Sequence, residues 1–238
     1  MIPAYNEEQR LPSTLDTVLA YLRHRESDFS PWEVIVVNDG SRDGTAALVR
    51  RLAASEPNLR LLDNPGNKGK GYSVRHGMLE ARQEWVLFSD ADLSAPIDEL
   101  PKLFAAVERE QAAVAIGSRA LDRSLIGTHQ SPFRELGGRF FNLMVQLGTG
   151  MRLWDTQCGF KLFRRDAARA VFQRLQLERF GFDVEALFIA QRLGFRIVEE
   201  PVRWNHVDGT KVNMLRDSID MFGDIARVRW NWWKGLYK

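Results

Sequence analysis

Short apolar segments alternate with helical repeats over the first half of the chain. The apolar segments are rich in Val, Ile and Leu and lie at 32–37, 59–62, 85–88 and 112–117. Between them, apolar residues recur every three or four positions, which predicts helices; these ranges are 11–24, 46–54, 72–82 and 96–110. This order predicts a mostly parallel, Rossmann-like α/β sheet with helices on both faces.

The second half is less regular but has no linker or low-complexity break. We expect a loop and then a helix within 124–150. A turn that runs into a strand is expected at 155–163, helices at 167–175 and 184–193, and a strand at 196–200. An apolar stripe then predicts a C-terminal amphipathic helix. We therefore expect one domain over 1–212, followed by this helix within 213–238. Only Met1 and Ile2 precede PAYNEE, so the first strand is expected to be truncated, or the natural chain to begin upstream.

Polar clusters follow the short first strand and the segments at 32–37, 59–62 and 85–88: PAYNE, NDGS, NKGKG and SDADLS, in that order. The carboxyl ends of parallel strands meet at one edge of the sheet, and ligands of such sheets bind beyond that edge. The agreement in position of these four clusters predicts a binding site there. The spacings G-x-x-x-x-G-K and G-x-G-x-x-G are absent, which disfavours P-loop and dinucleotide-binding folds.

Composition narrows the function classes. The 238 residues are 45% hydrophobic and 27% charged, an ordinary balance for a globular protein, and the net charge of +2 gives no argument for nucleic acid as a partner. The single cysteine, Cys158, excludes an internal disulfide, and the four histidines are scattered. The sequence contains no run of about 18 apolar residues, so no transmembrane helix is predicted. No signal peptide is expected either.

Asp90 and Asp92 flank Ala91 directly after the apolar segment 85–88. Two carboxylates this close repel each other unless something compensates them. Mg²⁺ and Mn²⁺ prefer oxygen ligands and often complete their coordination with substrate phosphates. The alternative is a solvated turn whose aspartates cap the next helix, and the motif alone leaves both interpretations open.

Asp39, in the NDGS segment, can accept hydrogen bonds from a base or a ribose, or can form an ordinary Asx turn. In the NKGKG loop, Lys68 or Lys70 and the backbone amides can hold a phosphate. Arg119, Arg134 and Lys211 supply cations in the second half. Each of these three is an ordinary surface charge by itself, but together they can bind a second anionic group.

The closing segment interleaves aromatic and basic side chains, in the sequence RVRWNWWKGLYK. This mixture suits the headgroup region of a bilayer. The alternative is that the tryptophans pack the last helix against the domain.

Seven segments together resemble the family 2 inverting glycosyltransferases of the GT-A fold. They are IPAYNEE, VVNDGSRDGT, NKGKGYSVRHGM, FSDADLSAP, GSR, DTQCGFKLF and GFDVE, in this order over residues 2 to 212. Within the family the likeness is to the dolichyl- and polyprenyl-phosphate hexosyltransferases, the β-glucosyltransferases first and the mannosyltransferases next. One departure is EPVRW at 200–204, where processive members have Q-x-x-R-W. This departure argues against a polysaccharide synthase.

The resemblance assigns roles to individual residues. It implies that the nucleotide sugar is bound by residues of the first four clusters and by one later lysine: Pro3, Ala4, Tyr5, Glu7, Asp39, Lys70, Asp90, Ala91, Asp92 and Lys211. It implies Mg²⁺ or Mn²⁺ on Asp90 and Asp92, with Lys211 closing over the donor diphosphate. Arg119 and Arg134 would hold the acceptor phosphate.

Asp183 and Glu185, in GFDVE, would lie near the acceptor as a base, or be structural. A phosphate acceptor is already an anion near pH 7, so a base is not obligatory.

The resemblance therefore implies transfer of one hexose, with glucose from UDP-glucose favoured, to a dolichyl or polyprenyl phosphate. The protein would lie peripherally on the cytoplasmic side of a membrane. Three alternatives remain: GDP-mannose as donor, a hydroxyl acceptor that requires Asp183 or Glu185 as base, and a nucleotide-sugar binding protein without activity.

Overall fold

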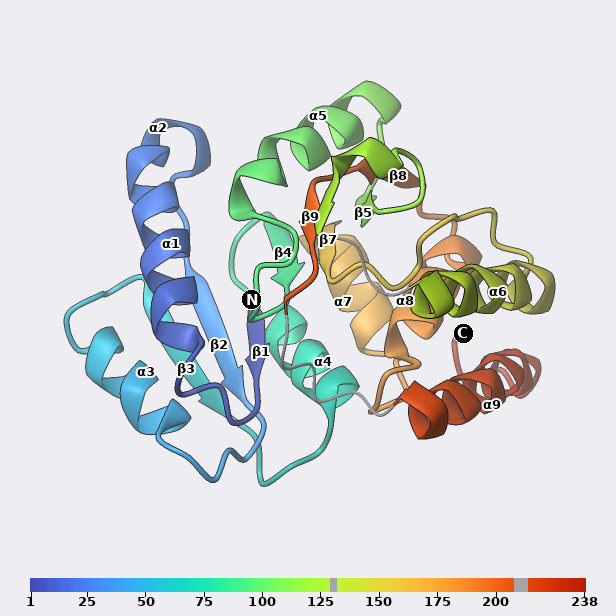
Figure 1. Ribbon diagram of the computed structural model, residues 1–238, viewed down its shortest axis with the longest axis horizontal. Coiled ribbons are helices and arrows are strands. Elements are labelled where there is room, and N and C mark those ends of the chain that lie inside the picture. Colours follow the sequence, from blue (N-terminus) through green and yellow to red (C-terminus); the bar gives the residue numbers. More distant parts are fainter. Residues whose placement is uncertain (129–131, 208–213) are drawn as a thin grey trace.

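The predicted sheet is present in the computed structural model, which describes residues 1–128, 132–207 and 214–238 (Figure 1). Within 132–135 and 214–222 only the backbone is described. The strands of the main sheet are β1 (Ile2–Ala4), β2 (Val34–Asn38), β3 (Leu59–Asp63), β4 (Trp85–Ser89), β5 (Val114–Ser118), β7 (Phe160–Arg164) and β8 (Ile197–Pro201). Two short strands, β6 (Ile126–Thr128) and β9 (Trp204–Asn205), pair beside it.

The helices follow the strands in the expected alternation over the first half of the chain. They are α1 (Leu11–His24), α2 (Glu26–Phe29), α3 (Thr45–Ala53), α4 (Lys70–Glu80), α5 (Leu100–Glu110), α6 (Pro132–Thr149), α7 (Arg165–Phe172), α8 (Phe182–Arg192) and α9 (Met214–Trp233). Two 3₁₀ turns, η1 (Ile97–Glu99) and η2 (Arg123–Leu125), complete the set. In α5, a proline in the first turn and a left-handed C-cap at Gln111 fix the two ends.

The strand order is β1-β2-β3 in one ladder and β4-β7-β5-β8 in another. The two ladders meet where the Ser89 amide donates to the Met1 carbonyl oxygen, 3.1 Å away, which places β1 beside β4. β1, β2 and β3 run parallel, as do β5 and β8, whereas β7 runs antiparallel between β4 and β5. The mostly parallel sheet is thus confirmed, and the reversed strand is a feature that the sequence pattern did not indicate.

Alternate side chains of the central strands enter two separate apolar clusters. Ile35 and Val37 of β2 pack in the cluster that contains residues of α4, α7 and α8, whereas Val34 and Val36 pack in the cluster of α1 and α5. This two-residue alternation is what a strand covered on both faces requires. The prediction of helices on both faces is therefore confirmed.

The C-terminal segment divides its aromatic residues between the core and the surface. Trp232 packs edge-on against Phe188 of α8, with ring centroids 6.0 Å apart, and Tyr237 is completely buried. The Tyr237 hydroxyl donates to a carboxylate oxygen of Glu185 in α8. Trp230 and Trp233 are instead exposed. Both interpretations of this segment therefore retain a structural basis, each for different residues.

Figure 1 shows α6 and α9 side by side at one end of the molecule, with the C-terminus between them. These two helices pack against each other. Among the described residues, no helix combines the length and the apolar character needed to cross a bilayer.

Replacing Tyr237 with Phe should lower the free energy of unfolding by about 1–3 kcal/mol, because a buried carboxylate oxygen loses its hydroxyl donor. Urea denaturation measures this change. Tyr21→Phe is the matched control, because the Tyr21 hydroxyl is buried without a hydrogen-bond partner among the described residues. Its removal should be neutral or stabilising, and an equal loss in both variants would contradict the anchoring role of Tyr237.

Candidate functional site

The PAYNE and NDGS segments are joined by hydrogen bonds at the carboxyl ends of β1 and β2. The Asp39 amide donates to the Ala4 carbonyl oxygen at 2.9 Å. The Asn6 amide donates to the Ser41 hydroxyl at 2.9 Å, and the Arg42 amide donates to the Asn6 side-chain oxygen at 2.8 Å. These contacts bring two segments that are far apart in the sequence to one edge of the sheet.

The remaining residues predicted in the first segment lie around this junction. Ala4 is buried, and Pro3, Tyr5 and Glu7 are half-buried. The Glu7 amide donates to the Thr45 hydroxyl at 2.8 Å, which ties the segment to the start of α3. These contacts hold the segment against the connection between β2 and α3.

Asp39 holds the NKGKG loop. Its carboxylate accepts from the Asn64 side chain (2.8 Å) and from the amides of Lys68 (2.9 Å) and Gly69 (2.8 Å), and only 4% of the residue is exposed. Gly40 has a φ of 67°, and a Cβ there would lie 2.5 Å from the Gly66 carbonyl carbon. A glycine is thus required for the two loops to approach. Asp39, which the sequence predicts to bind the nucleotide, therefore holds the loop that leads into α4.

Lys70, the first residue of α4, forms an ion pair with Asp90 at the end of β4. The Lys70 Nζ to Asp90 Oδ1 distance is 2.7 Å, and the ammonium lies 5.4 Å from the centre of the Phe88 ring. Burial alone would lower the pKa of Lys70, but Asp90, Asp183 and Asp92 together raise it above its usual value. Two predicted site residues from distant segments are therefore in direct contact.

The backbone around Asp90 and Asp92 is shaped to present both carboxylates. Gly159 leaves room for Asp90, since a Cβ at Gly159 would lie 2.0 Å from Asp90 Oδ2. Asp92 Oδ1 accepts from the Ser94 amide at 2.9 Å, and Leu93 between them has a left-handed φ of 48°. This conformation costs a leucine on the order of 1–3 kcal/mol, and such strain concentrates at functional sites.

The Asp90 and Asp92 carboxylates fit a divalent cation by the chemistry of their donors. Both supply hard oxygen ligands, and the Asp90 side chain stays 29% exposed beside its lysine. Within the described ranges, three or more His, Cys, Asp or Glu side chains do not gather into a metal-binding group. Mg²⁺ is commonly bound by one or two carboxylates together with waters and substrate phosphate oxygens, which is the kind of site that Asp90 and Asp92 can provide.

Asp183, in the first turn of α8, is paired with a buried lysine. Lys161 Nζ of β7 donates to Asp183 Oδ1 at 2.5 Å and to the Cys158 carbonyl oxygen at 2.5 Å, and it lies 5.6 Å from the centre of the Phe88 ring. Burial raises the pKa of Asp183, and Lys161 and Lys70 offset part of this rise. Lys70 and Lys161 thus share the Phe88 ring between the two aspartates.

Glu185 faces the protein interior. It is fully buried, one oxygen accepts from the amides of Gln176 (3.0 Å) and Leu177 (2.7 Å), and the other accepts from Tyr237. Burial raises its pKa, and hydrogen bonds from Tyr237 and the two amides oppose that shift. Of the two roles that the sequence left open for Glu185, this geometry favours the structural one.

Arg119 follows β5 and lies within the electrostatic reach of Asp90 at the end of β4. Burial alone would lower its pKa, but Asp155 and, to a smaller degree, Asp90 raise it above the usual value. Arg134 belongs to α6, but its side chain is not among those described. Lys211 lies outside the described residues. The contacts of these two cations therefore stay predictions.

Sequence reasoning did not assign roles to Lys161, Asp155 and Trp204, although the structure places all three beside predicted site residues. One signal was present for Lys161. In the strand Phe160–Arg164, Lys161 is two residues from Phe163 and therefore lies on the same face of the strand. A buried apolar residue would be expected at that position. Asp155 and Trp204 carry no such local signal, because their contacts with Arg119 come from distant segments.

The model of the family described as glycosyl transferase family 2 matches residues 1–172. Curated proteins similar to nearly the whole chain are named dolichyl-phosphate beta-glucosyltransferases. One from Trichomonas vaginalis is 39% identical and covers 93% of this chain and 68% of its own length. Those from Dictyostelium discoideum and Homo sapiens are 37% and 35% identical, cover 100% of this chain, and match over 75% and 76% of their own lengths.

Solved structures share the fold at low sequence identity. Glucosyl-3-phosphoglycerate synthase from Mycobacterium tuberculosis, in complex with Mn²⁺, UDP-glucose and phosphoglyceric acid, has a TM-score of 0.65 and 18% identity over 95% of this chain and 77% of its own. Mannosyl-3-phosphoglycerate synthase from Rubrobacter xylanophilus has a TM-score of 0.66 and 19% identity over 98% and 73%. The GT-A fold predicted from the motifs is thereby confirmed.

Replacing Lys161 with Met should lower the free energy of unfolding by about 3–5 kcal/mol, because the buried Asp183 carboxylate loses its counter-charge. Adding Asp183→Asn to this variant should restore part of the loss. Lys102→Met is the matched control, since Lys102 also pairs with a buried carboxylate but is 41% exposed, and Glu99 keeps Arg203. Thermal and urea denaturation test these values, and a loss under 1 kcal/mol in Lys161→Met would refute the dependence.

Proposed function

Because this chain belongs to glycosyl transferase family 2, we propose that it transfers one glucose from UDP-glucose to a dolichyl or polyprenyl phosphate, with inversion at the anomeric carbon. The carrying observation is the identity of 34–40% to dolichyl-phosphate beta-glucosyltransferases over almost the entire chain. The arrangement of charges at the sheet edge supports the same assignment. A donor diphosphate and an acceptor phosphate are both anions, and cations approach this edge from two sides.

The donor half is formed by the joined loops after β1, β2, β3 and β4. We assign the nucleotide to the surface made by the PAYNE segment and by the loop that Asp39 holds, with contacts from Pro3, Ala4, Tyr5, Glu7, Asp39, Ala91 and Lys70. Lys70 is fixed beside Asp90, so its ammonium is available next to a bound diphosphate without a large rearrangement. Lys211 would close over the same diphosphate.

Asp90 and Asp92 would hold Mg²⁺ or Mn²⁺ at the donor diphosphate, where the cation supplies Lewis-acid neutralisation of the leaving group. Asp90 is positioned for this by Lys70 and by the space that Gly159 leaves. Asp92 is positioned by its Asx turn with Ser94. The two carboxylates thus keep their orientation before the donor binds.

The acceptor half is assigned to Arg119 and Arg134. A phosphate monoester has a second pKa of about 6 and is therefore largely ionised at neutral pH. Its oxygen is already a nucleophile, so the protein needs to orient it rather than to remove a proton. Glu185 is committed to Gln176, Leu177 and Tyr237, and Asp183 is paired with Lys161. Transfer without a general base agrees with these contacts better than transfer to a hydroxyl.

Peripheral binding to the cytoplasmic face of a membrane is part of the proposal. The apolar side chains of α6 recur at spacings of three and four and are more than half exposed: Leu136, Phe140, Leu143 and Leu147. Beside them, the C-terminal segment exposes Trp230 and Trp233, and the Lys234 ammonium lies 5.1 Å from the centre of the Trp230 ring. Apolar and aromatic residues among basic ones suit a lipid headgroup region.

Asp92→Asn should reduce Mn²⁺-dependent glucose transfer at least about 100-fold, because a metal contributes several kcal/mol to leaving-group stabilisation. The amide keeps an oxygen for the Ser94 turn, so the melting temperature should be unchanged. Asp16→Asn, at an exposed position of α1, is the control. Product formation from a panel of nucleotide sugars and polyprenyl phosphate, followed by mass spectrometry, together with Mn²⁺ titration, tests this. Chelator-insensitive turnover in both variants would sink the metal assignment.

The same panel separates the alternatives. Product from GDP-mannose but not from UDP-glucose would establish the mannosyltransferase. Absence of both transfer and donor hydrolysis would favour a binding protein without activity.

Leu143→Glu combined with Leu147→Glu should lower partition onto vesicles that contain anionic lipid at least about tenfold. Burying one leucine is worth about 1.5–3 kcal/mol, and 1.4 kcal/mol corresponds to a factor of ten. Gln111→Glu combined with Gln173→Glu, which adds the same two charges at exposed positions after α5 and α7, serves as the control. Flotation on a sucrose gradient measures the bound fraction. Equal flotation of the double variant and the wild type would argue against α6 as a lipid-facing helix.

A further inference from the structure

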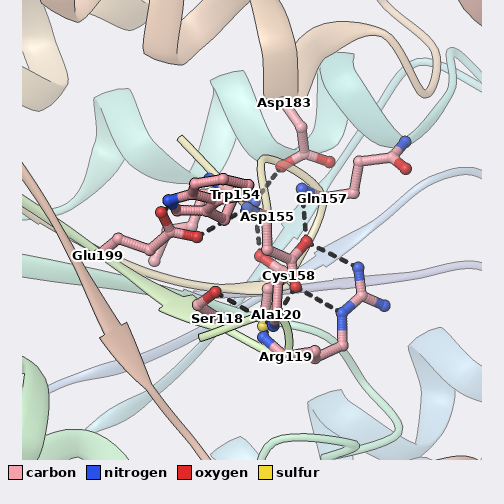
Figure 2. Close-up of polar contacts among 10 residues, drawn as sticks. Ser118, Arg119, Ala120, Trp154, Asp155, Gln157, Cys158, Asp183 and Glu199 are labelled. Atoms are coloured by element: carbon pink, nitrogen blue, oxygen red, sulfur yellow. Dashed lines mark hydrogen bonds and ion pairs between the residues drawn. The ribbon is translucent and has the colours of Figure 1, made fainter. Parts of the chain in front are cut away.

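We propose that Asp155 is a positioning residue that orients the Arg119 guanidinium toward the acceptor phosphate, an inference that rests on the proposed function. Asp155 precedes the buried strand β7, and Arg119 follows β5, so the two come from different segments of the chain. Figure 2 shows their side chains facing each other beneath the Trp154–Cys158 turn.

Asp155 binds Arg119 through three hydrogen bonds. Asp155 Oδ2 accepts from the Arg119 backbone amide at 3.0 Å and from Nε at 2.7 Å, and Oδ1 accepts from Nη2 at 2.8 Å. Two parallel bonds between a guanidinium and a carboxylate fix the plane of the guanidinium as well as its position. The third bond fixes the backbone from which that side chain extends.

The pair is asymmetric in its burial. Asp155 is 6% exposed, whereas the Arg119 side chain is 29% exposed. A guanidinium has five N–H donors in a fixed fork, and Asp155 takes two of them. The carboxylate therefore holds the inner edge of the guanidinium, and the outer edge faces the exposed side. This is the orientation that an anion arriving from the site requires.

Trp204 and Glu199 complete the support. The Arg119 Cζ atom lies 5.3 Å from the centre of the Trp204 ring, which restricts the guanidinium from its flat side. Glu199 of β8 accepts from the amides of Trp154 (2.8 Å) and Asp155 (2.7 Å). The sheet thus fixes the turn, the turn fixes Asp155, and Asp155 fixes Arg119.

Pairing with Asp155 also changes what Arg119 can offer an anion. The ion pair carries no net charge, so its long-range attraction for a phosphate is small. Recognition then depends on the direction of the remaining N–H groups, which only a fixed guanidinium supplies. In Asp155→Asn, the amide keeps one acceptor oxygen, but its NH₂ group replaces the other and faces a guanidinium N–H, so the bidentate pair is lost.

Asp155→Asn should therefore raise the KM for polyprenyl phosphate about tenfold, because one charged, bidentate contact loses its geometry. The KM for UDP-glucose should change less than about twofold, since Arg119 serves the acceptor. Asp166→Asn is the matched control: Asp166 also binds an arginine, Arg164, through two bonds of 2.7 and 2.9 Å, but on the exposed surface. Neither KM should change in this control.

A double-mutant cycle shows whether Asp155 acts through Arg119. Arg119→Ala should raise the acceptor KM by at least as much as Asp155→Asn, and adding Asp155→Asn to it should change the acceptor KM less than about twofold. If Asp155→Asn raises the acceptor KM tenfold in both backgrounds, Asp155 does not act through Arg119. If it lowers the acceptor KM, net charge outweighs orientation. Either result overturns the inference.

Arg119→Lys tests the same point if Asp155→Asn fails to fold. Lysine keeps the charge but has no fork for Asp155, so the acceptor KM should rise as in Asp155→Asn, and a normal KM would overturn the inference. Transfer by the wild type with an unchanged acceptor KM in Asp155→Asn refutes the inference alone. Failure of the wild type to glycosylate polyprenyl phosphate from any nucleotide sugar refutes the proposed function as well.

Discussion

Pairing of charges at the carboxyl edge of the sheet is the interaction on which the rest of this site depends. Asp90 is held by Lys70, Asp183 by Lys161, and Asp155 by Arg119, and each pair joins segments that are far apart in the sequence. An aspartate desolvated without such a partner would take up a proton or destabilise the fold. The cations therefore allow several carboxylates to gather where the strands end. The buried Phe88 ring lies near two of these cations, the ammonium groups of Lys70 and Lys161.

Hydrogen bonds within the protein hold the loops at this edge in place. Asp39 accepts hydrogen bonds from the side chain of Asn64 and from two backbone amides of the following loop. The carboxylate that the sequence predicts as a nucleotide contact therefore also stabilises this loop. Glycines at 40 and 159 permit approaches that a Cβ would block. Loops that are held in this way need little further ordering when a ligand binds. The left-handed conformation of Leu93 belongs to the same arrangement, because it follows Asp92 directly.

The C-terminal segment divides its aromatic side chains between the core and the surface. Trp232 and Tyr237 pack against α8, and Tyr237 donates to Glu185, so the last residues contribute to the core. Trp230 and Trp233 face outward on the same helix, beside the exposed apolar stripe of α6. In the proposed membrane binding, anchoring by Tyr237 would keep this surface in place while it exposes apolar side chains.

The sequence by itself determined the alternation of strands and helices, the sheet covered on both faces, and the gathering of polar clusters at the strand ends. These features follow from local periodicity and from the turn residues after each strand, which a single chain segment carries. The antiparallel direction of β7 was decided only in the tertiary structure, because strand periodicity is the same in both directions. The partners of Lys161 and Asp155 were decided there too. A buried ion pair depends on which distant segment supplies the opposite charge, and no spacing along the chain encodes that contact.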